Sequence, residues 1–173
     1  ALPYLADHRI YGQVVVPGAF HLSLLLGAAE IAFNSNRCIL EQIIFPEVLV
    51  IPSDSGRLVQ LGITPHENQH QGDFQLISLE NNSTSSSSNN SWKIHGKGRI
   101  VSQKKSTDFE LTKIELTEVK SRCEQLITGE QIYSNLSQRQ INLGSTFQWI
   151  QSVWKGEEEV LCLLQAPKSL TDT

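Results

Sequence analysis

The chain has 173 residues, of which 39% are hydrophobic, and a formal net charge of −4. This length fits one domain, or one domain and part of a second. A mildly acidic chain has no overall field to attract nucleic acid or an anionic membrane, so we expect neither as a partner. Three cysteines, odd in number and far apart, match neither a metal site nor a disulfide framework, which favours a reducing, cytoplasmic location.

An apolar helix dominates the N-terminal part of the chain. Residues 1–18 predict a loop and a strand that lead into it, and Pro17 suits the start of a helix because its missing N–H is not needed there. Residues 19–34 are apolar on nearly all sides, which predicts a helix buried all round. At about 15 residues the helix is too short to span a bilayer. The polar residues 34–36 predict its end.

The segments after the helix predict antiparallel strands. The Ser- and Asn-rich residues 80–90 interrupt them and predict a disordered loop, in which glycosylation patterns at Asn82 and Asn89 are interpreted as chance. One helix followed by several such strands predicts an α+β domain, with a sheet curled around the helix. The expected strands are residues 38–51 with a bend at Pro46, 57–64, 73–80 and 92–101.

The strand at residues 92–101 has two chemically different faces. Strict alternation predicts a buried face of Trp92, Ile94, Gly96, Gly98 and Ile100 and a polar face of Lys93, His95, Lys97 and Arg99. We expect His95 to make a structural hydrogen bond. The three cations could meet an acidic partner protein, but a solvated face is the simpler interpretation.

Two further histidines have the spacing of metal ligands. His66 and His70 lie four residues apart, as ligands on one helix face do. Their segment predicts a loop, however, and it adds no cysteine or carboxylate cage. We therefore expect no metal site.

The chain is expected to divide into three parts. Residues 1–102 form the first domain, residues 103–140 a linker with short helices, and residues 141–173 the start of a second domain that is incomplete. The chain begins at Ala1 and contains no methionine, and no stretch resembles a signal peptide or a membrane span. We expect it to be a segment of a longer protein.

Residues 8–17 have the form HxxxGxxxxP, in which the fixed positions are His8, Gly12 and Pro17. Together with the Gly18-Ala19 that follows, this motif resembles the dehydratase domains of modular type I polyketide synthases. Further stretches resemble that family in the same order, so that the resemblance covers nearly the whole chain. These are residues 92–98, 122–123, 133–136, 143–148 (similar to the family's YGPxFQ) and 152–156.

The resemblance implies a double hotdog fold, of which this chain holds the first half and the start of the second. A hotdog is a curved antiparallel sheet around a central helix. The resemblance makes His8 the catalytic histidine and implies an aspartate partner outside this chain. It gives substrate-binding roles to Gly12, Pro17, Gly18, His21, Leu143 and Phe147, although His21 is more simply interpreted as a hydrogen-bonded core residue.

Three positions depart from the family pattern. Leu143 and Ser145 stand where YGPxFQ has tyrosine and proline, and Gln140 stands where the family usually has glycine. A tyrosine hydroxyl near the site is therefore missing, and the turn at Ser145 is less rigid than with proline.

The activity that the resemblance implies is removal of water from a 3-hydroxyacyl thioester carried on an acyl carrier protein. A histidine with a near-neutral pKa suits the base, and a carboxylic acid kept protonated in a dry pocket suits the acid. No cofactor is expected beyond the carrier's phosphopantetheine arm. The expected partners are the carrier protein, neighbouring synthase domains and a second copy of the chain. Two alternatives stay open: a cyclase or double-bond isomerase with the same fold, and a non-catalytic structural remnant.

Overall fold

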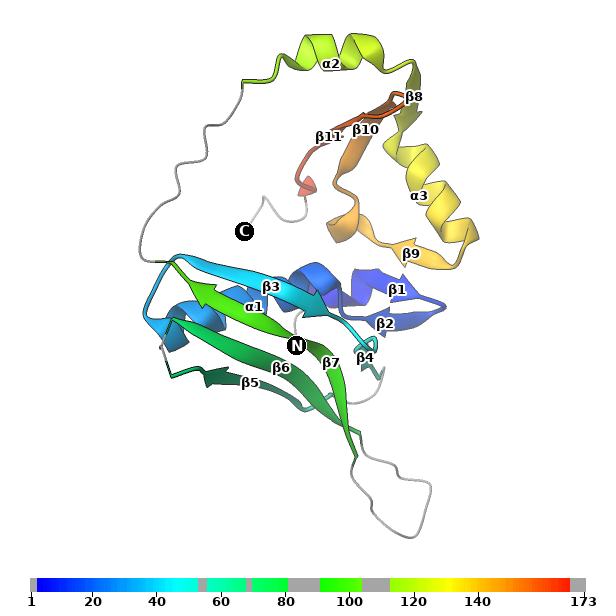
Figure 1. Cartoon of the computed structure of the whole chain (residues 1–173). Coiled ribbons are helices and arrows are strands. Elements are labelled where there is room, and N and C mark those ends of the chain that lie inside the picture. Colours follow the sequence, from blue (N-terminus) through cyan, green and yellow to red (C-terminus); the bar gives the residue numbers. More distant parts are fainter. Residues whose placement is uncertain (1–2, 53–55, 68–69, 81–90, 104–112, 169–173) are drawn as a thin grey trace. The chain divides into compact units, whose positions relative to one another are not determined.

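The computed structural model describes residues 3–52, 56–67, 70–80, 91–103 and 113–168. The expected Ser- and Asn-rich loop, with Asn82 and Asn89, lies outside these residues. The chain divides into two compact units (Figure 1). Unit 1 joins Ala1–Val14 to Phe109–Thr173, and unit 2 is the continuous segment Val15–Asp108.

Unit 2 is a four-stranded antiparallel sheet with one helix against it (Figure 1). The strand order is β3-β7-β6-β5, and Leu25 and Ala29 of the helix α1 pack on Phe74 and Ile100 of the sheet. Its elements are α1 (Gly18–Phe33), β3 (Cys38–Ile44), β4 (Val50–Ile51), β5 (Val59–Pro65), β6 (Gln71–Glu80) and β7 (Ser91–Ser102). The expected sheet and helix are therefore present, and the core lies between them.

Helix α1 is buried on one face only, which corrects the expectation of burial all round. His21, Leu25 and Ala29 are buried at successive four-residue steps, the spacing of one helix face. Leu24 is 42% exposed and Ile31 85% exposed on other faces. A single sheet packs against one side of a helix, so apolar composition alone overstated its burial. The helix ends at Asn34, in the left-handed conformation that Asn tolerates at a helix end.

A bulge in β7 overturns the expected alternation of that strand. In the ladder with β6, Leu76 pairs with Gly96 while Ile77 pairs with Ile94, so His95 is one extra residue. Such an insertion exchanges the two faces of the strand on one side of it. Trp92 and Ile94 therefore lie on the opposite face from Ile100, and Trp92 is 48% exposed.

The same bulge divides the expected basic face. Lys97 pairs with the exposed Gln75, but Lys93 pairs with the buried Ser78, and paired residues project to the same side of a sheet. Arg99 lies 3.9 Å from Asp73 on the outer side, in an ion pair between exposed groups. Lys93 and the other two cations thus do not form one surface.

Unit 1 combines the first residues of the chain with its C-terminal part (Figure 1). Strand β1 pairs with β2 and β9, and a separate antiparallel sheet has the order β11-β10-β8. Its elements are η1 (Pro3–Asp7), β1 (His8–Ile10), the start of β2 (Gln13–Val15), α2 (Leu116–Arg122), β8 (Gln125–Thr128), α3 (Gly129–Gln138), β9 (Ile141–Leu143), η2 (Ser145–Phe147), β10 (Ile150–Lys155) and β11 (Val160–Leu164).

Helix α3 belongs to unit 1 rather than to a linker. Thr128 and Gln131 form a reciprocal capping box at its start, which satisfies two free N–H groups. The hydroxyl of Tyr133 accepts a hydrogen bond of 2.8 Å from the N–H of Ile150 in β10. This division differs from the expected boundaries, because residues 1–14 and α3 both group with the C-terminal strands. In the part of the chain that the structure describes, no helix has the length and apolarity to cross a membrane.

Candidate functional site

The candidate catalytic residue, His8, begins strand β1 in unit 1. It pairs with Leu143 of β9, and the ladder continues to Ile10 opposite Ile141. The His8 ring is half-buried, and its centroid lies 5.1 Å from that of Phe147 with the rings tilted at 57°. Two predicted substrate residues, Leu143 and Phe147, are therefore brought to the predicted catalytic histidine.

A tight turn follows β1 and contains Gly12. Tyr11 has φ of 51° and Gly12 has φ of 78°, which is the left-handed pair that a two-residue hairpin turn requires. The guanidinium of Arg9 donates a hydrogen bond of 3.1 Å to the carbonyl of Gly12, and the N–H of Tyr11 donates one of 2.8 Å to Gln140. The glycine in the motif is thus explained first by the geometry of this turn.

Asp7, the residue before His8, contacts the turn η2 that carries Phe147. Its main-chain carbonyl accepts a hydrogen bond of 2.7 Å from the N–H of Gly144. Its carboxylate accepts two more from Thr146, at 2.9 Å from the hydroxyl and 3.2 Å from the backbone N–H. A Cβ added at Gly144 would clash with the carboxyl group of Asp7. Sequence reasoning gave neither Asp7 nor Thr146 a role.

The other predicted site residues lie in unit 2, at the start of α1. The carbonyl of Pro17 accepts hydrogen bonds from Phe20 and His21, at 3.0 and 3.3 Å. Gly18 is the first helical residue, and an added Cβ there would meet Phe45 at an ordinary contact distance of 3.7 Å. These residues form a regular helix start, and their roles toward substrate stay predictions.

His21 is buried beneath this helix start. It is 4% exposed and lies 5.6 Å from the ring of Phe45, and its two ring nitrogens find no hydrogen-bond partner among the described residues. His21 is therefore a core residue, as expected, but the hydrogen bond expected for it is not found among the described residues. Burial, and next the proximity of His95, lower the pKa of His21 below its ordinary value, so the ring is neutral at pH 7.

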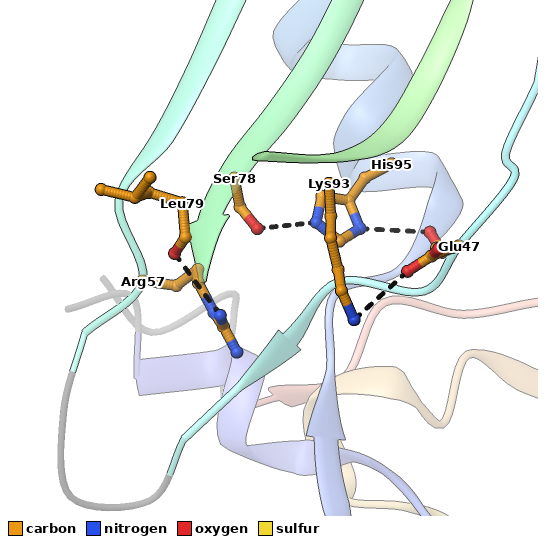
Figure 2. Close-up of polar contacts among 6 residues, drawn as sticks. All are labelled: Glu47, Arg57, Ser78, Leu79, Lys93 and His95. Atoms are coloured by element: carbon orange, nitrogen blue, oxygen red, sulfur yellow. Dashed lines mark hydrogen bonds and ion pairs between the residues drawn. The ribbon is translucent and has the colours of Figure 1, made fainter. Parts of the chain in front are cut away.

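A cluster of polar contacts in unit 2 surrounds the buried His95 (Figure 2). Its Nε2 lies 2.8 Å from the hydroxyl of Ser78 and its Nδ1 lies 3.2 Å from the carbonyl of Glu47. A carbonyl can only accept, so Nδ1 donates to Glu47 and a neutral ring accepts from Ser78 at Nε2. The expected structural hydrogen bond at His95 is confirmed, but inside the protein instead of on a polar face.

This cluster borders a cavity of about 330 Å³. Lys93 makes an ion pair of 3.6 Å with the Glu47 carboxylate, and Arg57 donates a hydrogen bond of 3.5 Å to the carbonyl of Leu79 (Figure 2). Sequence reasoning missed the cluster. The available signal was Ser78, a polar residue at a position of β6 where alternation predicts a core side chain.

The described residues contain no cluster of three or more His, Cys, Asp or Glu side chains that could hold a metal ion. His66 instead lies 2.9 Å from the carboxylate of Asp73.

Known proteins resemble both the sequence and the fold of this chain. The model of the "polyketide synthase dehydratase domain" matches residues 1–79, and that of the "polyketide synthase dehydratase N-terminal domain" matches residues 112–173. The polyketide synthase PksM of Bacillus subtilis is 27% identical over 96% of this chain, which corresponds to 4% of PksM.

Solved dehydratase structures align with almost all of the chain. The CurJ dehydratase, as an inactive histidine-to-phenylalanine mutant in complex with Compound 21, is 42% identical over 97% of this chain with a TM-score of 0.80. The dehydratase domain from the CurF module of the curacin polyketide synthase is 27% identical over 98%, with a TM-score of 0.84. This chain spans 55% of the former structure and 57% of the latter.

These likenesses define the class of protein. The fold is α+β and of the hotdog type, and the chain covers about half of a double hotdog, as expected. The chain belongs to the dehydratase domains of polyketide synthases.

Proposed function

We propose that this chain supplies the histidine of a site that removes water from a 3-hydroxyacyl thioester and releases the 2-enoyl thioester. The substrate would be carried on the phosphopantetheine arm of an acyl carrier protein. The observation that carries the proposal is the half-buried imidazole of His8, at the first position of the HxxxGxxxxP motif and against Phe147, in a chain of the dehydratase family.

His8 would act as the base. A neutral imidazole has a lone pair on one ring nitrogen, which can take the proton next to the thioester carbonyl. An aspartic acid outside these 173 residues would protonate the departing hydroxyl. The CurJ histidine-to-phenylalanine mutant is described as inactive, and so is an aspartate-to-asparagine mutant of the CurK dehydratase, which is 25% identical to this chain. These relatives support one histidine and one aspartate as the reacting pair.

The thioester oxygen gains negative charge as the proton leaves, so hydrogen-bond donors must face it. We propose a backbone N–H group near Gly12, which lies in the same unit as His8, as one of these donors. At the position of the family tyrosine, Leu143 offers an apolar side chain instead of a hydroxyl. Discrimination between substrates at this position would therefore depend on shape rather than on a hydrogen bond.

The elimination moves a proton and a hydroxide but no net electrons, so the proposed reaction needs no redox cofactor. The carrier protein, neighbouring synthase domains and a second copy of the chain are the proposed partners, and the cytoplasm is the proposed location. The matched synthases are far longer than this chain, which supports a role within a multidomain protein.

The test is incubation of the complete dehydratase domain with 3-hydroxyacyl carrier proteins, followed by mass spectrometry of the intact carrier. We expect loss of one water, and a rate that falls about 10²–10⁴-fold in His8→Ala because the base is removed. The control is His66→Ala, which changes a histidine of unit 2 that contacts Asp73 and should leave the rate unchanged.

No water loss with any chain length or hydroxyl stereoisomer would overturn the proposed reaction. Conversion without a change in mass would instead support the isomerase or cyclase alternative. Water loss that is unaffected by His8→Ala would show that another group is the base.

A further inference from the structure

Asp7 connects the strand of the proposed base to the turn that carries its aromatic neighbour. Its main-chain carbonyl extends the ladder between β1 and β9 by one hydrogen bond, to Gly144. Its carboxylate then accepts both hydrogen bonds from Thr146, one residue before Phe147. Three hydrogen bonds thus join the residue before His8 to the segment that ends in the Phe147 ring.

The fit between Asp7 and this turn is close. The Thr146 hydrogen bonds are partly buried, and hydrogen bonds to a charged acceptor are stronger than neutral ones. At Gly144 an added Cβ would clash with three atoms of the Asp7 carboxyl group. A side chain at position 144 would therefore displace the Asp7 carboxylate from its place against the turn.

The turn also lacks the usual covalent restraint. Ser145 stands at the position where the similar family segment has proline, so its φ angle is not locked by a ring. Hydrogen bonds must then hold the turn. The N–H of Phe147 donates one of 3.0 Å to the Gly144 carbonyl within the turn, and the two that Thr146 donates to the Asp7 carboxylate connect the turn to the residue before His8. The Phe147 ring packs against the His8 imidazole at 5.1 Å, and its position limits how that imidazole can rotate.

We propose that Asp7 is a positioning residue. Through Thr146 it holds Phe147 against His8 and so keeps the imidazole in the orientation needed for proton abstraction. The inference rests on the proposed function in that His8 is the base. Asp7 itself touches neither the substrate nor the reacting atoms in this role.

The first experiment compares Asp7→Ala with Asp7→Asn in the complete dehydratase domain. Asp7→Ala removes the acceptor, and we expect kcat to fall roughly 10- to 100-fold with a small change in KM, since a misplacement of about 1 Å can cost that much. Asp7→Asn keeps an acceptor oxygen of the same reach and should recover most of kcat. The matched control is Asp73→Ala, which removes an exposed carboxylate of unit 2 and should leave kcat unchanged.

A milder change covers the case in which Asp7→Ala does not fold. Thr146→Val keeps the backbone donor and the side-chain shape but removes the hydroxyl donor. It should lower kcat by less than Asp7→Ala, and the double variant should be no slower than Asp7→Ala alone, because both changes break one linkage. Urea unfolding of each variant separates a loss of kcat from a loss of folded protein.

An independent measurement is the NMR signal of the His8 imidazole, assigned by its absence in His8→Ala. The signal should shift or broaden in Asp7→Ala and return toward the wild-type position in Asp7→Asn. A wild-type kcat and signal in Asp7→Ala would overturn the inference, and so would an Asp7→Asn variant as slow as Asp7→Ala. If the wild-type protein removes no water, the proposed function fails, and the NMR signal alone decides whether Asp7 orients His8.

Discussion

His8 in unit 1 and His95 in unit 2 show two ways of holding a histidine. The His95 ring is 3% exposed, and each of its nitrogens lies within hydrogen-bonding distance of an oxygen. The His8 ring is half-buried and packs against Phe147. A ring with both nitrogens engaged inside a core contributes to stability, whereas a half-buried ring can be reached by a substrate.

The two histidines also differ in which segments of the chain contact them. His95 lies in a bulge, and its partners Ser78 and Glu47 come from the same continuous unit. His8 depends on the C-terminal segment of unit 1, which reaches it through β9 and the turn η2. The comparison therefore predicts that changes around His95 alter the free energy of unfolding, whereas changes around His8 alter activity.

The largest effect on the free energy of unfolding is expected when His95 loses its buried partner Ser78. In Ser78→Ala the Nε2 atom of His95 is left without a partner, and a buried unsatisfied group costs about 1–3 kcal/mol of unfolding free energy. Urea unfolding measures this loss, while kcat of the folded protein should not change. The control Ser121→Ala removes an exposed hydroxyl that donates to Glu118, and should stay within about 0.5 kcal/mol of wild type. Equal effects of the two changes would contradict the comparison.

A smaller effect is expected from acid, through His21. Because the pKa of His21 is lowered in the folded protein, the unfolded chain binds its proton more readily. The contribution of His21 to stability is therefore constant above its unfolded pKa of about 6.5 and falls as the pH decreases below that value. His21→Leu removes the titrating group and should give a shallower fall in unfolding free energy between about pH 6.5 and pH 5. Parallel curves for the two proteins would disprove this role.

The smallest effect is expected at Gln140, just after helix α3. Gln140 has φ of 60°, a conformation that costs a residue with a Cβ about 1–2 kcal/mol, whereas glycine adopts it freely. Gln140→Gly should therefore stabilise unit 1, by less than about 1 kcal/mol once the greater freedom of glycine in the unfolded chain is subtracted. Ser134→Gly, in the interior of the helix, is the matched control and should destabilise. Thermal unfolding of both variants gives the two signs.

Much of the fold follows from the sequence because local patterns determine it. The helix after Pro17, its end at Asn34 and the strand at residues 92–101 all lie within a residue or two of their predicted positions. The glycine of the HxxxGxxxxP motif is also explained, because Gly12 has φ of 78° in a turn that needs a left-handed residue. The family usually has glycine at the position of Gln140, and the positive φ of Gln140 explains this preference, because glycine adopts such a conformation without strain.

Other features could not be predicted because they depend on pairing between distant segments. The bulge at His95 is visible only once β6 and β7 are aligned, and it reverses which face carries Lys93. The role of Asp7 depends on Thr146, 139 residues away in sequence. The burial of α1 depends on how many of its faces are covered by other elements, and this number cannot be inferred from an apolar composition.

The construction of unit 1 from two distant segments has a consequence for biosynthesis. Unit 2 is continuous, so its sheet can close as soon as its last strand has left the ribosome. Strand β1 is translated early, but it pairs with β9 near the other end of the chain. Asp7 can form its hydrogen bonds with Thr146 only after 139 further residues have been translated. At about 5–20 residues per second this delay is on the order of ten seconds. For that time the strand that carries His8 has one unpaired edge, which is open to wrong pairing with neighbouring nascent chains.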